Sequence, residues 1–245
     1  MCLVALFYRV AEDAPVVVGA NREEFYARGG EPPSLHPGAL PFVAGVDPVA
    51  GGTWLGVNAR GVVVAVTNRR RSETPPAPRS RGLLVRELLR LPTAKEAADV
   101  GARELDRHLY AGCNLICIDA SHAIVLHHAD WLRVRMLPPG LHLVANRDVN
   151  DESDDRISYA AHWLNQRPYR FAENCLVALR QLCGLREPGM PAMCLRGPQH
   201  GTVSSSLIAL RTPLTESVYL HAQGPPDKTP YADYSPLLRD MMSSA

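Results

Sequence analysis

Short apolar runs, rich in β-branched residues, alternate with turn sequences near the start of the chain. Residues 2–8 and 16–20 are two such runs, and Asp13-Ala14-Pro15 lies between them. Two β-compatible runs on either side of a turn predict a hairpin. The pattern recurs at 53–57 and 62–67, where the connecting segment ends in Gly61, a residue suited to a positive φ. We therefore expect the first part of the chain to form antiparallel strands.

Helical periodicity appears after a polar, Pro-rich stretch at 69–81 that predicts a loop. Leucines recur at helical spacing from residue 83 to residue 91. Thr93 followed by Glu96 forms a capping box, which opens a helix that runs to about Arg107. The later patterns predict helices over 155–165 and 171–183, and strands over 113–119, 123–128, 132–136, 142–145, 202–210 and 217–222.

Strands joined by hairpins build mostly antiparallel sheets, and helices must cover the faces that would otherwise expose apolar residues. The order of elements fits an α+β protein with two such sheets, and a four-layer αββα sandwich satisfies it. There is no repeat and no clean internal boundary. We therefore expect residues 1–245 to form a single domain.

Charge and hydropathy narrow the range of partners. The formal net charge is +1, which gives no electrostatic reason to expect a nucleic-acid partner. No apolar run approaches the ~20 residues of a membrane span, so we expect no stable membrane insertion. The N-terminal apolar run lacks a basic leading segment and a small-residue cleavage site. The expected location is the cytoplasm, where the six cysteines would be free thiols.

Cys2 is the most informative position for chemistry. Residue 2 is small, so removal of Met1 is expected to leave a cysteine with both a thiol and a free α-amine. An α-amine has a pKa near ~7.7–8.0, so it can accept the proton of its own side-chain thiol. One residue would then supply both nucleophile and base. The alternative is a cysteine that merely packs within a buried strand.

The second strand continues into Asn21-Arg22-Glu23-Glu24. In a hairpin, Arg22 comes near the start of the first strand and so near Cys2. Its guanidinium would favour the thiolate and could bind an acyl or carboxylate group. Glu23 and Glu24 could orient Arg22 or the α-ammonium. The alternative is a cluster of surface ion pairs at a strand end.

Two asparagines also follow strands. Asn68 and Asn146 could donate hydrogen bonds to an oxyanion, or they could simply cap turns. The chain has no H-E-x-x-H, Walker A, G-x-G-x-x-G or G-x-S-x-G motif, and no cysteine spacing typical of zinc, so we expect no metal site.

These residues together resemble the NRDE family, also called the Transport and Golgi organisation protein 2 family. The matching pieces are Met1-Cys2, Asn21-Arg22-Glu23-Glu24, Gly51-Gly52-Thr53-Trp54-Leu55-Gly56-Val57-Asn58, Thr67-Asn68, Ser80-Arg81-Gly82-Leu83, 112–115, Asn146 and Gly201-Thr202. They follow the family order over nearly the whole chain, and the Gly-Gly-Thr-Trp block is the most specific. Glu23 stands where the family usually has Asp.

The family resembles N-terminal-nucleophile hydrolases of the cysteine branch, which include penicillin V acylases and conjugated bile-acid hydrolases. This resemblance implies the αββα fold, Cys2 as nucleophile, Arg22 beside it, and Asn68 and Asn146 as polar site residues. The hydrolase branch usually has an Asp three residues after the Arg, where this chain has Phe25.

Two functions follow from the resemblance. The first is a hydrolase or acyltransferase that acts on a small amide or thioester and needs no cofactor. The second is a non-catalytic carrier of haem, acyl-lipid or acyl-CoA that uses the same pocket.

Overall fold

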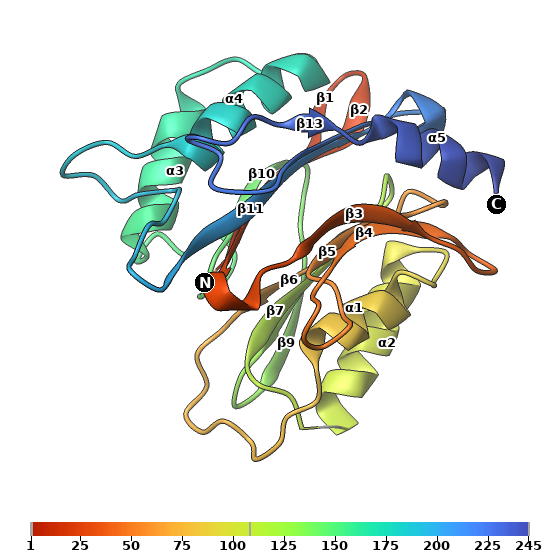
Figure 1. Ribbon diagram of the computed structural model, residues 1–245, viewed down its shortest axis with the longest axis vertical. Coiled ribbons are helices and arrows are strands. Elements are labelled where there is room, and N and C mark those ends of the chain that lie inside the picture. Colours follow the sequence, from red (N-terminus) through yellow and green to blue (C-terminus); the bar gives the residue numbers. More distant parts are fainter. Residues whose placement is uncertain (1, 108, 245) are drawn as a thin grey trace. The chain divides into compact units, whose positions relative to one another are not determined.

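Two antiparallel sheets organise the chain, and each belongs to a unit of its own (Figure 1). The computed structural model describes residues 2–107 and 109–244. The first unit contains Met1–Gly29 and Pro139–Pro236, and the second contains Gly30–Pro138 and Leu237–Ala245. The single domain expected over 1–245 stays a prediction.

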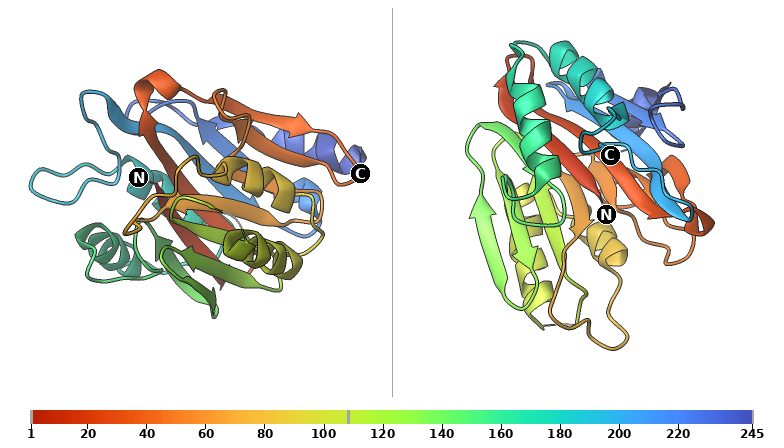
Figure 2. Two further views of the ribbon diagram at one scale, coloured as in Figure 1. Left: turned by 90° about the horizontal axis from the view of Figure 1, so that it is seen from below. Right: turned by 90° about the vertical axis from the view of Figure 1, so that its left-hand side faces the viewer.

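The sheet of the first unit has six strands, and every pair of neighbours is antiparallel. The long central strands run side by side in both views of Figure 2. In sheet order the strands are β10 (Gly140–Val144), β1 (Leu3–Ala11), β2 (Ala14–Phe25), β11 (His200–Leu210), β12 (Val218–Ala222) and β13 (Ala232–Asp233).

Two helices, α3 (Asp155–Asn165) and α4 (Ala172–Gly184), cover one face of this sheet (Figure 1). Alternate residues of β1, among them Leu3 and Phe7, join apolar residues of both helices in one buried cluster. Burial of such side chains contributes about 1.5–3 kcal/mol each. We call this side the helix face of the sheet, and the other side the open face.

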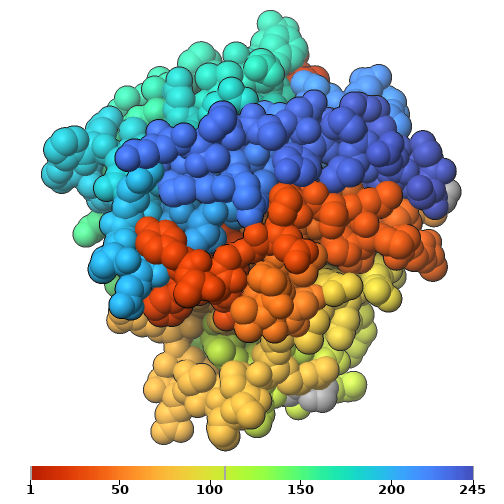
Figure 3. Space-filling model, viewed as in Figure 1, coloured from red at the N-terminus to blue at the C-terminus, as the bar shows by residue number. Residues whose placement is uncertain are grey.

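The sheet of the second unit is a seven-stranded antiparallel meander, because its strands follow one another in sequence order. The strands are β3 (Glu31–His36), β4 (Phe42–Val46), β5 (Leu55–Asn58), β6 (Val63–Asn68), β7 (Cys113–Ile118), β8 (Ala123–His128) and β9 (Leu132–Met136). Helices α1 (Arg81–Leu88) and α2 (Ala94–Arg107) pack on one face of it. The loop between β6 and α1 projects from this unit (Figure 3).

The Gly-Gly-Thr-Trp-Leu-Gly-Val-Asn block has a structural role. The Asn58 amide donates to the carbonyls of Leu89 and Leu91 at 2.9 and 2.8 Å, and its oxygen accepts from two backbone N–H groups of the following turn. A Cβ at Gly52 would lie 2.4 Å from the Gly82 backbone, so only glycine allows this close approach. The block therefore ties α1 to the β5–β6 hairpin.

Most of the predicted elements are present. Gly61 has a φ of 74°, and the Glu96 N–H donates to Thr93 Oγ1 at 3.1 Å, so the predicted turn and the N-cap role of Thr93 are confirmed. The Glu96 carboxylate accepts from the Thr93 hydroxyl at 3.1 Å and not from its backbone N–H, so the second bond of a capping box is not shown. The prediction of two antiparallel sheets with helices is also confirmed.

The differences concern strands β3 and β5, the last helix, and strands β4 and β13, which the sequence pattern did not predict. β3 was missed because Pro32 and Pro33 disfavour a strand interior, but Pro is tolerated at a sheet edge, where β3 lies. β5 begins at Leu55, two residues later than expected. The sequence pattern also did not predict α5 (Ser235–Ser243). None of the helices within the described residues is both long enough and apolar enough to cross a membrane.

Candidate active site

Cys2 immediately precedes β1, at one end of the first unit's sheet. The first residue pair between β1 and β2 joins Leu3 to Asn21, so one further step of the same register sets Cys2 opposite Arg22. Directly opposed residues of antiparallel strands project to the same face. Leu3 belongs to the helix-face cluster, so Cys2 and Arg22 project to the open face.

The surroundings of the Cys2 sulfur are polar on one side. Cys2 is 7% exposed, and burial raises the pKa of its thiol. The backbone N–H of Glu23 hydrogen-bonds the sulfur and the Arg22 guanidinium lies near it, and both act to lower the pKa. Sequence reasoning anticipates the effect of Arg22 but not that burial outweighs it. The Cys2 thiol is therefore mostly protonated at neutral pH and needs a proton acceptor to become a nucleophile.

Arg22 is held by its own strand and the turn that follows. One of its Nη atoms donates to the carbonyl of Gly29, and the other lies 4.0 Å from the Glu24 carboxylate. Arg22 and Glu24 are two residues apart on a strand, so they share the open face. Glu24, rather than Glu23, is therefore the carboxylate beside Arg22. Phe25, at the position of the Asp usual in the hydrolase branch, is exposed and stacks edge-on against His200.

Asn146 and Asn68 belong to different units. Val144, at the end of β10, pairs with Val4, so the half-buried Asn146, two residues farther on, lies at the Cys2 end of the same sheet. Asn68 is the exposed last residue of β6 in the second unit, opposite Cys113. The structure therefore brings Cys2, Arg22, Glu24 and Asn146 to one end of one sheet, and it assigns Asn68 to the other sheet.

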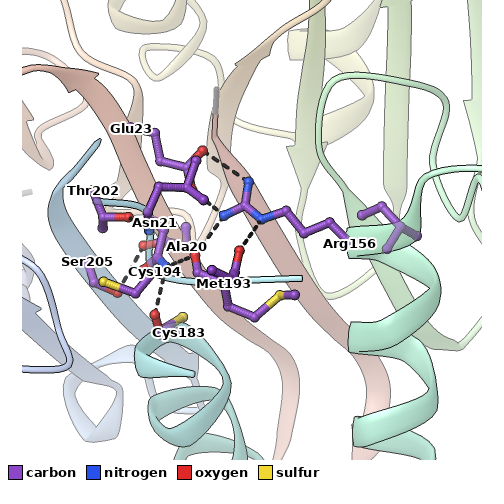
Figure 4. A network of polar contacts seen from close by, with 12 residues as sticks. Ala20, Asn21, Glu23, Arg156, Cys183, Met193, Cys194, Thr202 and Ser205 are labelled. Atoms are coloured by element: carbon purple, nitrogen blue, oxygen red, sulfur yellow. Dashed lines mark hydrogen bonds and ion pairs between the residues drawn. The ribbon is translucent and has the colours of Figure 1, made fainter. Parts of the chain in front are cut away.

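The alternate residues Asn21 and Glu23 project to the helix face instead (Figure 4). Glu23 forms a bidentate ion pair with Arg156, in which Nη1 donates to Oε2 at 3.0 Å and Nη2 donates to Oε1. The Glu23 side chain is fully buried, and burial raises its pKa while Arg156 acts in the opposite direction. Arg156 also donates from Nε to the Ala192 carbonyl at 3.0 Å and from Nη2 to the Met193 carbonyl at 2.7 Å.

Arg156 is the site residue that sequence reasoning missed. It lies in the first turn of α3, where the Asp154 side chain caps the helix by accepting from two backbone N–H groups. A cation at a helix N-terminus opposes the helix dipole, which costs about 0.3–1 kcal/mol. This local effect does not identify a partner, and Glu23 is 133 residues away in the sequence.

Asn21 fastens the same strand end to the neighbouring segments. Its amide nitrogen donates to the carbonyls of Cys183 and Met193 at 2.9 and 3.0 Å (Figure 4). Cys183 lies in the last turn of α4, so this contact also satisfies a helix C-terminal carbonyl. The contacts of Asn21 and Glu23 on the helix face thus hold in place the strand segment that carries Arg22 on the open face.

Comparison with known proteins identifies the family. A family model for Transport and Golgi organisation 2 matches residues 1–177, which include Cys2, Asn21, Arg22, Glu23, Glu24, Asn68, Asn146 and Arg156. This chain belongs to the Transport and Golgi organisation 2 family.

Two mammalian members of the family show the extent of the likeness. The chain is 34% identical over 114 residues to the Transport and Golgi organization 2 homolog of Mus musculus. The aligned segment covers 43% of this chain and 39% of the mouse protein. It is 32% identical over 111 residues to the Homo sapiens homolog, and this aligned segment covers 44% of this chain and 40% of the human protein. The chain therefore matches about two fifths of the length of these relatives.

Solved structures with the same fold are acylases and amidases. Penicillin V acylase from Agrobacterium tumefaciens superposes with a TM-score of 0.61 at 13% identity, over 97% of this chain and 88% of the acylase. A Caenorhabditis elegans ortholog of N-acylethanolamine-hydrolyzing acid amidase superposes with a TM-score of 0.60 at 16% identity, over 84% of this chain and 92% of the ortholog. A variant of conjugated bile acid hydrolase from Clostridium perfringens superposes with a TM-score of 0.53 at 10% identity, over 98% of this chain and 94% of the hydrolase. These likenesses show that the family member has the N-terminal-nucleophile hydrolase fold, consistent with the predicted sandwich.

The position of Arg22 leads to a prediction about thiol reactivity. Arg22→Ala removes a positive charge that favours the Cys2 thiolate, so the pH midpoint of iodoacetamide labelling at Cys2 should move upward and labelling at neutral pH should slow several-fold. Arg22→Lys should restore part of the electrostatic effect. Mapping of the labelled residue by mass spectrometry across pH measures both. If the folded Arg22→Ala variant shows the same pH profile of labelling as the wild-type protein, Arg22 does not influence the Cys2 thiol.

Proposed function

We propose that this family member is an N-terminal-nucleophile hydrolase or acyltransferase that acts on a small amide or thioester, with Cys2 as the nucleophile. The observation that carries the proposal is the placement of Cys2 and Arg22 on the open face of one sheet end. The likeness of the fold to acylases and amidases supports it. Those neighbours are an ortholog of N-acylethanolamine-hydrolyzing acid amidase, a penicillin V acylase and a conjugated bile acid hydrolase.

The proposed reaction begins once Met1 has been removed. The Cys2 α-amine takes the thiol proton, and the sulfur attacks the carbonyl carbon of the substrate. The C–S bond forms, the C–N or C–S bond to the leaving group breaks, and the ammonium proton passes to that group. Water or an acceptor nucleophile then cleaves the thioester and regenerates the thiol. The raised pKa of the thiol supports a mechanism that carries its own base, because burial leaves little thiolate beforehand.

The neighbouring residues have separate roles in this proposal. Arg22 stabilises the thiolate and binds an oxygen of the substrate, since a guanidinium offers several donors and stays charged. Asn146 is an oxyanion donor from the same sheet end. Glu24 orients Arg22, and the Glu23–Arg156 pair holds the strand from the opposite face. The role of Asn68 as a second donor stays a prediction, and a fall in kcat for Asn68→Ala would support it.

Intact-mass spectrometry with an electrophilic acyl probe tests the proposal. We expect the purified protein to lack Met1 and to gain one acyl group, which peptide mapping places on Cys2. The carrier alternative, in which the protein holds haem or an acyl-lipid without chemistry, requires neither result. Retained Met1 together with no adduct at Cys2 would contradict the hydrolase proposal.

A further inference from the structure

A β-bulge in β11 lies directly opposite the residues of the candidate site. Thr202 pairs with Glu23, but Ser204, not Val203, pairs with Arg22, so β11 has one extra residue at this point. An extra residue resets the alternation of side chains along the strand. Thr202 therefore shares the helix face with Glu23, while Ser204 shares the open face with Arg22. Without the bulge, Ser204 would project toward the helices.

Ser204 is largely buried, and its hydroxyl is left without a hydrogen-bond partner within the part of the chain that the structure describes. Its residue is 6% exposed, and among residues 2–107 and 109–244 its side chain makes no hydrogen bond. The adjacent Ser205, on the helix face, is satisfied by the Ala20 carbonyl at 3.2 Å and the Tyr231 hydroxyl at 2.6 Å. The Ser204 hydroxyl oxygen is not among the fully buried polar atoms of the described residues that lack a partner, so it is accessible to solvent or to a ligand. Ser204 is thus placed beside Arg22 with its hydrogen-bonding capacity unused.

The segment beside Ser204 is held by two linked hydrogen bonds, which run from the buried Ser206 to the exposed Gln223. Ser206 pairs directly with His221, and the Ser206 hydroxyl lies 2.9 Å from His221 Nδ1. His221 Nε2 lies 2.8 Å from Gln223 Oε1. An amide oxygen only accepts, so Nε2 carries the proton and Nδ1 accepts from the Ser206 hydroxyl. The ring is neutral, in line with a pKa that burial lowers.

This chain of bonds sets the position of Gln223. Ser205 pairs with Ala222, the last residue of β12, and the exposed Gln223 follows it in a bend. The open face carries Cys2, Arg22 and Ser204 side by side at one end of the sheet. Cys2 and Ser204 are separated by two strand spacings, about 10 Å.

We propose that Ser204 is a specificity-determining residue of the Cys2 site, whose hydroxyl donates to an oxygen acceptor on the part of the substrate remote from the reacting carbonyl. The proposal rests on the proposed function. It narrows the substrate to an amide or thioester that carries a carbonyl, hydroxyl or carboxylate oxygen about 10 Å from the reacting carbon. The Arg22 guanidinium, between the two positions, favours a carboxylate among these.

Three matched chloromethyl ketones test the subsite. Each has a saturated chain of about eight bonds, which spans the distance between Cys2 and Ser204, and the chains end in a carboxylate, a carboxamide or a methyl group. The Cys2 sulfur displaces chloride, so a C–S bond forms as the C–Cl bond breaks. The second-order rate of labelling at Cys2 is followed by intact mass. We expect the carboxamide to react roughly 3- to 10-fold faster than the methyl probe, and the carboxylate about tenfold faster or more.

Three variants separate the Ser204 contact from a general change in the strand. Ser204→Ala should remove the preference for the carboxamide while the methyl probe reacts at the wild-type rate, and Ser204→Thr should retain the preference. Ser205→Ala alters the neighbouring residue on the helix face and should leave the preference unchanged. Equal rates for all three probes at Cys2 of the wild-type protein would overturn the subsite and leave the proposed function standing. No labelling of Cys2 by any probe would overturn the proposed function, and the subsite with it.

Discussion

Cys2→Ala is expected to abolish hydrolysis of small N-acyl amides, with kcat lower by a factor of about 10³ or more, because the variant lacks the nucleophile. Alanine is as small as cysteine, so removal of Met1 should proceed equally in both proteins. The α-amine base is then retained, and only the sulfur is lost. The measurement is the release of p-nitroaniline from a series of acyl p-nitroanilides whose acyl chains increase in length.

A second cysteine supplies the control. Cys175 is a fully buried thiol of α4 in the same unit, on the helix face. Cys175→Ala should lower stability through the loss of buried volume but leave kcat of the folded enzyme unchanged. If Cys2→Ala keeps the wild-type kcat on an amide that the protein cleaves, Cys2 is not the nucleophile.

Breaking the Glu23–Arg156 pair should cause the largest loss of stability. Glu23→Gln leaves a buried guanidinium without its counter-charge, and Arg156→Met leaves a buried carboxylate, so we expect each to lower the free energy of unfolding by about 3–5 kcal/mol. The double variant Glu23→Gln, Arg156→Met should recover part of the loss, because neither charge is left alone. Urea denaturation followed by circular dichroism measures all three.

An exposed pair in the same unit is the matched control. Arg170 and Glu12 form an ion pair at 3.1 Å, with side chains 71% and 59% exposed. Arg170→Met should cost no more than about 1 kcal/mol, since solvent screens exposed charges. A loss for Glu23→Gln no greater than that of Arg170→Met would show that the buried pair does not anchor the strand.

Local patterns in the sequence were sufficient to predict much of the fold. A hairpin pairs residues that are close along the chain, so the turn expected at Asp13-Ala14-Pro15 already indicated that Arg22 would come near Cys2. The structure places this turn at Glu12-Asp13, and Ala14 and Pro15 belong to β2. The N-cap hydrogen bond from the Glu96 N–H to Thr93 joins residues three apart and was predicted for the same reason. The period of two along β2 also separates Arg22 from Glu23, because adjacent strand residues face opposite sides.

The identity of the partners across the molecule was decided only by tertiary structure. The period of two shows that Glu23 and Arg22 diverge, but not that α3 brings Arg156 to Glu23 from 133 residues away. The bulge at Val203 leaves no hydrophobic signature, yet it determines that Ser204 shares a face with Arg22. Burial of Cys2 depends on the packing of the whole unit, so its raised thiol pKa could not be predicted from neighbouring charges. The sequence by itself therefore determined most of the strands, the hairpin that joins β1 to β2, and the nucleophile candidate, because these depend on short-range geometry. The anchoring pair, the bulge and the burial that tune the site depend on contacts between distant segments, which exist only once the chain has folded.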